Sequence, residues 1–295
     1  MVIVTGASGF IGSHLHVALD LATQSISLQD PDWSQKLASC KASSVVHLAG
    51  ITHNRNPENE IQKVNNDGTR ALGKEAARNG VKKFIFVSSI QAIGEKTCKG
   101  TALKTDATCS PQVAYGRSKL EAEHLLRRLS MESQMKVVII RPPLVYGPGV
   151  KANFRNLFEL ADKGFPMPLS ALNSNTRSFV AVSNLIDLIL LCLEHPAAAN
   201  QTFHVSDDDD ISTAELLRRM GKALGKPIRN LPIPQTILKT GLRLVGKSEW
   251  VDKLFGDLRV DISETKRLLG WKPKVTMEEE LERTAHWWRS RQGRG

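Results

Sequence analysis

The sequence predicts an α/β fold: a doubly wound parallel sheet with a smaller C-terminal domain. Short apolar runs rich in Val and Ile alternate with longer segments of helical periodicity, the pattern of stacked strand-helix-strand units. These runs are continuous, as in strands that are covered on both faces of a sheet. We expect strands at residues 2–4, 45–49, 84–87 and 137–140.

The expected first strand leads into a glycine-rich turn, in which residues 5–12 read Thr-Gly-Ala-Ser-Gly-Phe-Ile-Gly. Glycines let a pyrophosphate approach the backbone, and the helix expected over residues 10–21 offers free N–H groups and the positive end of its dipole. The turn favours a Rossmann-type nucleotide site, although its spacing is G-x-x-G-x-x-G rather than G-x-G-x-x-G. By itself it also fits an ordinary tight turn between a strand and a helix.

Tyr115 and Lys119 share one face of a helix expected from about Ser110 and Pro111 to residue 129. Because the two side chains stack at i and i+4, the ammonium group can lower the pKa of a phenol, which is ordinarily about 10. Such a pair can serve as a general acid and base. On its own it is also compatible with a tyrosine packed on the sheet beside a solvated lysine.

Three motifs follow one another along the chain: the glycine turn, a Ser88-Ser89 pair after the strand expected at 84–87, and the Tyr115/Lys119 pair. Each is weak evidence alone, and their joint order carries the argument. Together they indicate nicotinamide-dependent redox chemistry. The chain resembles the extended short-chain dehydrogenase/reductase family, in its NAD-dependent epimerase/dehydratase branch. The other motifs that carry this resemblance, in family order, are His47-Leu-Ala-Gly50, Asn65-Asn-Asp-Gly-Thr69, Val87-Ser-Ser89, Tyr115-Gly-Arg-Ser-Lys119, Arg141-Pro-Pro143 and Tyr146-Gly-Pro148.

The resemblance implies a catalytic group of three residues. Ser89 would hydrogen-bond the reacting oxygen, Tyr115 would exchange its proton, and Lys119 would hold the nicotinamide ribose. The resemblance also implies NAD or NADP as coenzyme. The residues expected to bind it are Gly6, Ser8, Gly9, Phe10, Ile11, Gly12, Leu48, Ala49, Gly50, Asn65, Val87, Ser88, Tyr115, Lys119 and Pro142.

Within this family the chain is similar to the members that act on nucleotide sugars, which include UDP-glucose 4-epimerases and reductases of 4-keto sugars in polysaccharide precursor synthesis. The residues expected to bind a UDP-hexose or UDP-N-acetylhexosamine are Ser89, Gln91, Asn153, Leu169 and Arg177. The planar fork of an arginine suits phosphate oxygens. A surface ion pair for Arg177 and a helix-capping role for Asn153 are the alternatives.

The segment after Ser89 narrows the reaction. Dehydratases of the family carry an Asp-Glu pair after the catalytic residue, whereas here Ser89 is followed by Ile-Gln-Ala-Ile-Gly, without a carboxylate. The reaction that remains possible is hydride transfer at one carbon of the sugar, expected to be C4. Its net result is either epimerisation or reduction of a ketone. Leu144 stands where many members have a sugar-contacting Asn, so the sugar can differ from glucose.

The chain is short between the glycine turn and His47. Family members have a second strand and helix there, and the strand ends in the residue that selects NAD or NADP. We expect residues 26–28 to be the strand that is normally third and 32–39 a short helix, so roughly 20 to 30 residues, one strand-helix unit, are absent after residue 21. Asp30 mimics the ribose-binding acid but is better explained by the turn before that helix. The coenzyme preference stays open.

The expected domains follow from these placements. Residues 1–148 with 174–206 would form the NAD(P)-binding Rossmann domain. Residues 149–173 with 207–295 would form a smaller substrate-binding cap, with substrate held between the two.

Composition limits other functions. The net charge of +10 comes from scattered basic residues, which favours an anionic small substrate over nucleic acid. Four cysteines without C-x-x-C spacing argue against zinc and disulfides, and the four acids at 207–210 fit a loop better than a metal site. No secretory signal or membrane anchor is visible. We expect a cytoplasmic protein without a metal ion and, from the family resemblance, a homodimer.

Two other hypotheses stay open. The missing unit favours a non-catalytic descendant that binds a nucleotide or a partner such as RNA, whereas the intact Ser89, Tyr115 and Lys119 argue against it. A reductase of a carbonyl compound without a nucleotide is the other, and it would be favoured if UDP failed to stabilise the fold.

Overall fold

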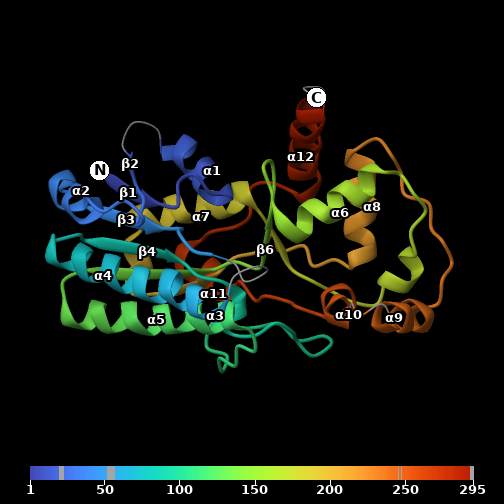
Figure 1. The fold of residues 1–295 in the computed structure, drawn as a ribbon, viewed down its shortest axis with the longest axis horizontal. Helices are drawn as coiled ribbons and strands as arrows, with labels where there is room; N and C mark the ends of the chain where they lie inside the picture. Colours follow the sequence, from blue (N-terminus) through green and yellow to red (C-terminus); the bar gives the residue numbers. More distant parts are fainter. Residues whose placement is uncertain (20–22, 52–56, 245, 247, 293–295) are drawn as a thin grey trace.

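The computed structural model describes residues 1–19, 23–51, 57–244, 246 and 248–292, without the side chains of residues 153, 248, 249, 253 and 292. Two lobes lie side by side: a sheet lobe built mainly from the first half of the chain, and a helical second lobe built mainly from the second half (Figure 1). In the described ranges, no helix is both long enough and apolar enough to cross a bilayer.

Six parallel strands form the sheet of the first lobe, in the order β2-β1-β3-β4-β5-β8. Their bounds are β1 Val2–Thr5, β2 Thr23–Ile26, β3 Ser44–His47, β4 Lys83–Val87, β5 Lys136–Arg141 and β8 Thr202–His204. From β1 the order runs outward in both directions, which confirms the doubly wound parallel sheet predicted from the sequence. β1 and β3 are neighbours, and their carboxyl ends form the switch point where such folds bind ligands.

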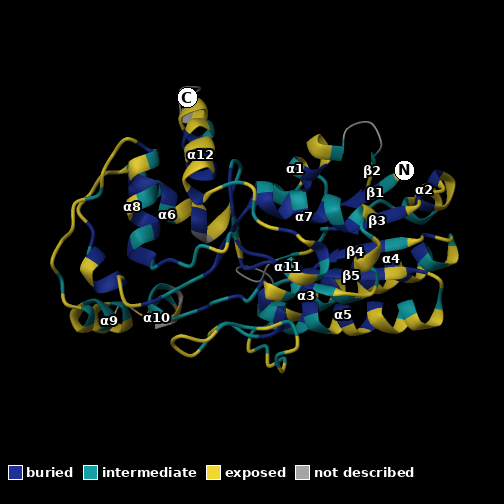
Figure 2. Ribbon diagram, turned by 180° about the vertical axis from the view of Figure 1, so that it is seen from behind, coloured by how far each residue is buried: buried dark blue, intermediate teal, exposed yellow. Residues whose placement is uncertain are grey.

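Helices cover both faces of the sheet. α1 Phe10–Leu19 and α7 Val182–Glu194 cover one face, and α2 Trp33–Cys40, α4 Gly68–Arg78 and α5 Ala114–Glu132 cover the other. Alternate residues of a strand point to opposite faces; in β4, Phe84 and Phe86 pack on the α5 side and Ile85 and Val87 on the α7 side. This double burial explains the continuous apolar runs, and Figure 2 shows the strands as largely buried.

The described residues place a single strand, β2, on the flank beyond β1. It pairs with β1 in parallel from Thr23 opposite Val2 to Ile26 opposite Thr5. The prediction that residues 26–28 form the strand that is normally third is therefore wrong in both bounds and position. β2 lies directly beside β1, where a Rossmann half has its second strand.

The helix expected from about Ser110 begins later, at Ala114. The Glu95 carboxylate accepts hydrogen bonds from the backbone N–H groups of Gln112 and Val113, at 3.1 and 3.3 Å. The Ser110 N–H instead donates to the Ile93 carbonyl. Glu95, from the preceding loop, thus accepts hydrogen bonds from the N–H groups just before α5. Sequence periodicity cannot show such a contact.

The second lobe has its own core. Its elements are α6 Ala152–Asp162, η4 Leu169–Leu172, α8 Thr213–Ala223, α9 Gln235–Leu244, α10 Ser248–Phe255 and α12 Met277–Gln292, with the two-stranded sheet of β6 Leu144–Tyr146 and β7 Phe179–Ala181. The rings of Tyr146 and Phe154 stack there with centroids 5.2 Å apart. Residues 258–262 and α11 Ser263–Leu269 return to the sheet lobe and pack beside β8. The chain therefore crosses between the lobes repeatedly, and side chains of both meet at the junction.

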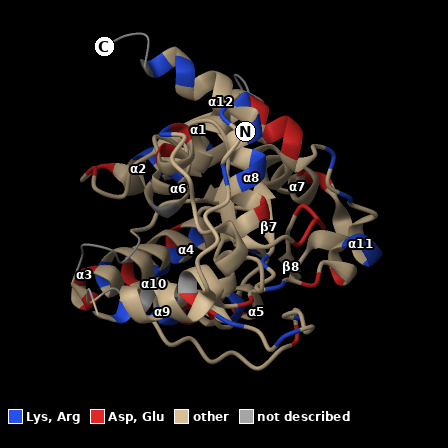
Figure 3. Cartoon of the chain, turned by 90° about the vertical axis from the view of Figure 1, so that its right-hand side faces the viewer, with Lys and Arg blue, Asp and Glu red and all other residues tan. Residues whose placement is uncertain are grey.

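Short helices lie in the connections: α3 Glu58–Gln62, η2 Lys63–Asp67, η3 Ile90–Ala92 and η5 Pro196–Ala198. The four consecutive acids at 207–210 diverge instead of gathering around one point. Their partners are, in order, Tyr146, Lys266, Arg219 and Arg259. Acidic and basic residues are interspersed along the ribbon shown in Figure 3, in keeping with the scattered charge of the sequence.

Candidate active site

The glycine turn connects β1 to α1 at the switch point. Gly6 has a φ of +73°, and a Cβ atom on it would lie 2.7 Å from the Ala49 backbone nitrogen. A Cβ on Gly12 would lie 2.1 Å from the Gly6 carbonyl oxygen. α1 has no acidic residue in its first turn, so the positive end of its dipole is left for an anion. This cradle fits the pyrophosphate of a dinucleotide.

Asn65 ties the loop after β3 to α5. Its side-chain oxygen accepts from the Ile51 N–H at 2.8 Å, and its amide donates to the Ile51 carbonyl at 3.0 Å and to the Ser118 hydroxyl at 3.1 Å. A Cβ on Gly50 would lie 3.1 Å from the Asn65 amide oxygen and 3.4 Å from Lys119 Nζ. The loop backbone thus passes directly beside the lysine.

Apart from Asn65 in η2 and Tyr115 and Lys119 in α5, the residues expected to bind a coenzyme follow strands along one edge of the sheet. Residues 6–12 follow β1, residues 48–50 follow β3, Val87 and Ser88 end β4, and Pro142 follows β5. The Pro142 carbonyl accepts from the Ile90 N–H at 2.9 Å, which holds η3 against the end of β5. The structure therefore brings these segments together at the carboxyl ends of neighbouring strands.

The three residues expected to be catalytic converge where β4 ends. The side chains of Ser89 and Tyr115 are hydrogen-bonded to each other. Lys119 Nζ donates to the Val87 carbonyl at 3.1 Å and lies 5.9 Å from the centroid of the Tyr115 ring. A Cβ on Gly116 would lie 2.3 Å from the Gln91 carbonyl oxygen, so this glycine lets η3 approach α5.

The charges of this group differ from the sequence-based expectation. Burial raises the pKa of Tyr115 to about 12, opposed by the hydrogen bond with Ser89. Burial lowers the pKa of Lys119 to about 8, opposed by the carboxylate of Glu123. In this structure burial outweighs any lowering of the phenol pKa by Lys119. That Lys119 stabilises a Tyr115 phenolate stays a prediction. At neutral pH the group therefore combines a neutral phenol with a protonated lysine.

A cavity of about 360 Å³ lies beside Ser89 and Tyr115, between the lobes. Of the residues expected to bind substrate, Ser89, Gln91 and Arg177 line it together with Tyr115. Leu169 is not one of its lining residues; its side chain is 1% exposed and packs in the core of the second lobe. Any contact of Leu169 with a substrate is therefore left to its backbone.

Arg177 lies half-buried at the junction of the lobes. Its Nη1 donates to the Gly256 carbonyl at 2.9 Å, and burial lowers the pKa of its guanidinium group. Among the described side chains, the lining of the cavity includes Arg177 and Lys151 but no acidic residue. This positive cavity suits an anionic substrate. The side chain of Asn153 lies outside the described residues.

Several cavity residues were not expected from the sequence. Trp250 and Leu254 of α10 line it, as does Thr213 at the start of α8. They lie about a hundred residues or more after Tyr115 in the chain and carry no motif. Leu144, singled out as a departure from the family pattern, also lines the cavity and is 40% exposed.

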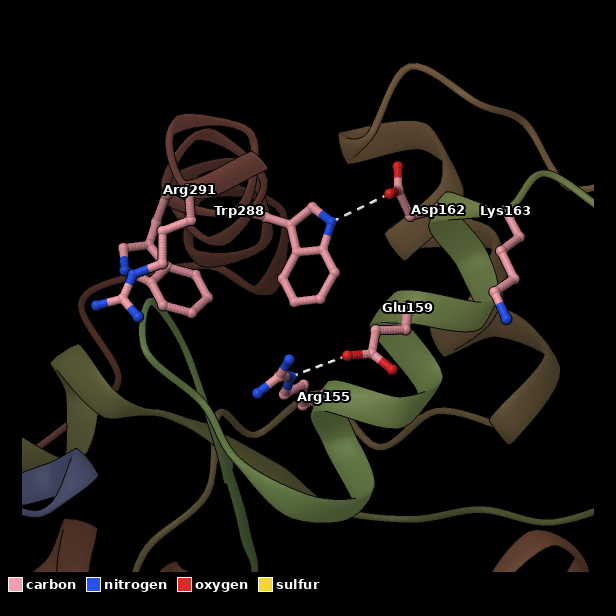
Figure 4. A pocket seen from close by; sticks show the side chains of 7 residues that line it. Arg155, Glu159, Asp162, Lys163, Trp288 and Arg291 are labelled. Atoms are coloured by element: carbon pink, nitrogen blue, oxygen red, sulfur yellow. Dashed lines mark hydrogen bonds and ion pairs between the residues drawn. The ribbon is translucent and has the colours of Figure 1, made fainter. Parts of the chain in front are cut away.

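A second pocket, of about 430 Å³, lies on the second lobe between α6 and α12 (Figure 4). Two pairings lie in its wall: Arg155 Nε donates to Glu159 at 2.9 Å, and the Trp288 indole N–H donates to the Asp162 carboxylate at 3.1 Å. Its described lining contains none of the residues expected from the sequence to bind a ligand. The residues expected to be catalytic therefore lie at the cavity between the lobes and not at this pocket.

The fold and this site define a Rossmann-type nucleotide-binding protein with a Ser-Tyr-Lys group at a cavity between two lobes. Residues 2–206 match the model of the NAD dependent epimerase/dehydratase family. The chain belongs to this family, and the resemblance seen in the sequence is confirmed.

Comparisons with individual proteins agree with this family membership. The chain is 43% identical to a UDP-glucose 4-epimerase of Vibrio cholerae over 308 residues, which cover 96% of this chain and 94% of that protein. A GDP-6-deoxy-D-mannose reductase of Pseudomonas aeruginosa is 24% identical, covering 98% of this chain and 97% of its own. The UDP-glucose 4-epimerase structure from Thermotoga maritima, with UDP-glucose, has a TM-score of 0.79, 22% identity and 99% coverage of both chains.

The Vibrio cholerae alignment spans 308 residues, whereas this chain has 295, so that protein contains residues without a counterpart here. In the short segment after α1, Asp30 pairs with Lys36 of α2. That contact supports its interpretation as part of the turn before α2.

Proposed function

We propose that this chain is an NAD(P)-dependent UDP-sugar 4-epimerase. The observation that carries the proposal is the convergence of Ser89, Tyr115 and Lys119 beside a cavity whose described lining includes two cationic residues and no acidic one. The 43% identity to a UDP-glucose 4-epimerase supports it. A 4-keto-sugar reductase is the second candidate, because the same three residues serve net reduction and a nucleotide-sugar reductase is similar over nearly the whole chain.

Bound nicotinamide would accept a hydride from C4 of the sugar or return one to it. The chain itself would handle the proton. In the direction of oxidation Tyr115 must first lose its own proton to solvent; its phenolate Oη then takes the proton of the C4 hydroxyl as the hydride leaves. The neutral phenol formed in this way returns the proton to the C4 oxygen in the reverse step. Ser89, already hydrogen-bonded to Tyr115, orients that oxygen. In an epimerase the hydride returns to the opposite face, so the coenzyme ends unchanged; in a reductase it is consumed.

The positive cavity supports a nucleotide diphosphate as the carrier of the sugar. Arg177 and Lys151 bring two cationic side chains to it. A guanidinium group suits phosphate oxygens because its donors match them two at a time. A sugar without the diphosphate would leave this charge uncompensated and would bind more weakly.

The first experiment is a fluorescence titration of the purified chain, its mass verified, with NADH and NADPH in parallel. Micromolar binding of either supports the proposal and names the coenzyme. Binding of neither would mean that the short flank beside β1 disables the site, and would favour the non-catalytic hypothesis.

The second experiment compares Tyr115→Phe with Tyr146→Phe. These are the two tyrosines of the chain, and Tyr146 lies in the core of the second lobe, hydrogen-bonded to Asp207. Interconversion of UDP-glucose and UDP-galactose, and of the N-acetyl pair, should fall by about 10² to 10⁴ in Tyr115→Phe with unchanged coenzyme affinity. Tyr146→Phe should retain turnover. Equal activity of all three proteins would refute the proposed role of Tyr115.

The same assay separates the two candidates. An epimerase interconverts its substrates without net use of coenzyme, whereas a reductase oxidises one NAD(P)H for each sugar. The homodimer and the cytoplasmic location expected from the sequence also belong to this proposal. Sedimentation of the purified chain and fractionation of cells test them.

A further inference from the structure

Glu123 is a fully buried carboxylate on α5 that the proton transfer does not use. It follows Lys119 by four residues, and Lys119 follows Tyr115 by four. Side chains at this spacing stack along one face of a helix. Glu123 therefore continues the row of catalytic side chains by one turn.

Each member of the row contacts a different residue where β4 ends. These contacts join Tyr115 to Ser89, Lys119 Nζ to the Val87 carbonyl at 3.1 Å, and Glu123 Oε1 to the Ser88 hydroxyl at 2.6 Å. Three successive turns of the helix thus engage three consecutive residues. A shift of α5 along β4 would disturb all three contacts together.

Arg141, the last residue of β5, holds Glu123 in place. Its Nε donates to Glu123 Oε1 at 2.9 Å and its Nη2 to Oε2, with side chains that are 4% and 0% exposed. Two parallel bonds fix the plane of the carboxylate. A buried ion pair is weak evidence for added stability, because removing both charges from water is costly. The place of this pair beside the catalytic group suggests another use.

We propose that Glu123, held by Arg141, is a positioning residue of the catalytic group. It sets the register of α5 against the end of β4, and it places a negative charge beside the Lys119 ammonium group. This inference rests on the proposed function, in which Lys119 and Tyr115 act together.

The charges around Lys119 support this role. On α5 it faces Tyr115 and Glu123, and the Glu123 carboxylate opposes the fall of the Lys119 pKa that burial causes. On β3 it faces His47, whose pKa is lowered by burial to about 3, so that this ring is neutral at pH 7. Arg141 contacts the same carboxylate from β5. Glu123 is thus the charge that favours the protonated form of Lys119.

The test compares Glu123→Gln, which keeps the shape but removes the charge, with Glu123→Asp, which keeps the charge. Glu121→Gln is the matched control, because Glu121 lies on the same helix but is exposed, accepting a hydrogen bond from Asn66. Titration of the Lys119 amine is followed without coenzyme, by pH-dependent acetylation and peptide mass spectrometry. Turnover against pH is measured on the same proteins.

We expect Lys119 to titrate near pH 8 in the wild type and in Glu121→Gln. In Glu123→Gln its midpoint should fall by about one pH unit, as loss of a nearby opposite charge predicts. The alkaline limb of kcat should move by the same amount, and Glu123→Asp should restore much of both. A folded Glu123→Gln protein with wild-type titration and pH profile would overturn the proposal.

A second variant covers the case in which Glu123→Gln does not fold. Glu123→Leu/Arg141→Met removes the pair without leaving either charge unpaired, a change that buried ion pairs often tolerate. A lowered Lys119 midpoint in this protein would support the proposal, and a wild-type midpoint would overturn it. If the wild type turns over no sugar nucleotide, the proposed function fails, while the amine titration still decides the role of Glu123.

Discussion

Acid should destabilise this protein through a buried histidine at the end of β3. His47 is 1% exposed; its Nδ1 lies 2.6 Å from the Thr5 hydroxyl and its Nε2 lies 2.8 Å from the Thr69 hydroxyl. The Thr69 hydroxyl donates its own proton to the Asn65 carbonyl, so it accepts from Nε2–H, and Nδ1 accepts from Thr5. A neutral His47 ring, with its proton on Nε2, therefore satisfies both contacts. A second proton, on Nδ1, would point at the Thr5 hydroxyl, which already donates to that nitrogen.

The magnitude follows from the pKa. Burial, and secondly the charge of Lys119, lower the pKa of His47 from 6.5 to about 3. Since the folded-state pKa lies below the unfolded one, the unfolded chain binds more protons below pH 6.5, and stability is lost as the pH falls toward 3. At pH 4.5, two units below the unfolded pKa, the loss should be about 2.7 kcal/mol from this residue.

Urea unfolding at pH 7, 5.5 and 4.5 measures this effect in the wild type, in His47→Gln and in His286→Gln, which removes an exposed histidine of α12. At pH 7 His47→Gln should be less stable by about 1 to 3 kcal/mol, because its threonine partners lose a hydrogen bond. By pH 4.5 that difference should shrink by about 2.7 kcal/mol, whereas His286→Gln should track the wild type. If the difference in unfolding free energy between the wild type and His47→Gln stays constant with pH, the reasoning about His47 is refuted.

Three further substitutions have defined outcomes. Gly12→Ala places a methyl group 2.1 Å from the Gly6 carbonyl oxygen, so NADH affinity in a fluorescence titration should fall by about tenfold or more. Gly116→Ala pushes η3 away from α5, at 2.3 Å from the Gln91 carbonyl oxygen; kcat should fall more than NADH affinity does. Phe158→Ala, in the core of the second lobe, should cost about 3 to 5 kcal/mol in urea unfolding, with unchanged Lys119 titration.

The coenzyme side of the site was predictable because its signals are local. The glycine turn, the loop at 48–50 and the serines at 88–89 each follow an apolar run that becomes a strand. Parallel strands end at one edge of a sheet, so residues that follow different strands must meet there. The spacing of Tyr115 and Lys119 predicted a shared helix face, and both side chains do face the end of β4.

The substrate side was less predictable because its residues come from distant segments. Arg177 lies in the cavity as expected, but Leu169 is buried in the core, and Trp250 and Leu254 face the cavity without any motif. The position of β2 was also missed, since an apolar run shows that a strand exists but not which neighbour it pairs with. Which strands pair, and which side chains line the cavity, depend on how whole helices and strands pack against each other.

By itself, the sequence determined the alternation of strands and helices, a glycine turn whose shape suits a pyrophosphate, and the row of side chains that Tyr115 and Lys119 begin on one helix face. These follow from periodicity, backbone freedom and spacing, which act over a few residues. Only the tertiary structure decided the charge of that row: burial raises the pKa of Tyr115, lowers that of Lys119, and sets Glu123 against Arg141 of another strand. Charge in a protein interior depends on water exclusion and on neighbours distant in the chain, and neither is written in local sequence.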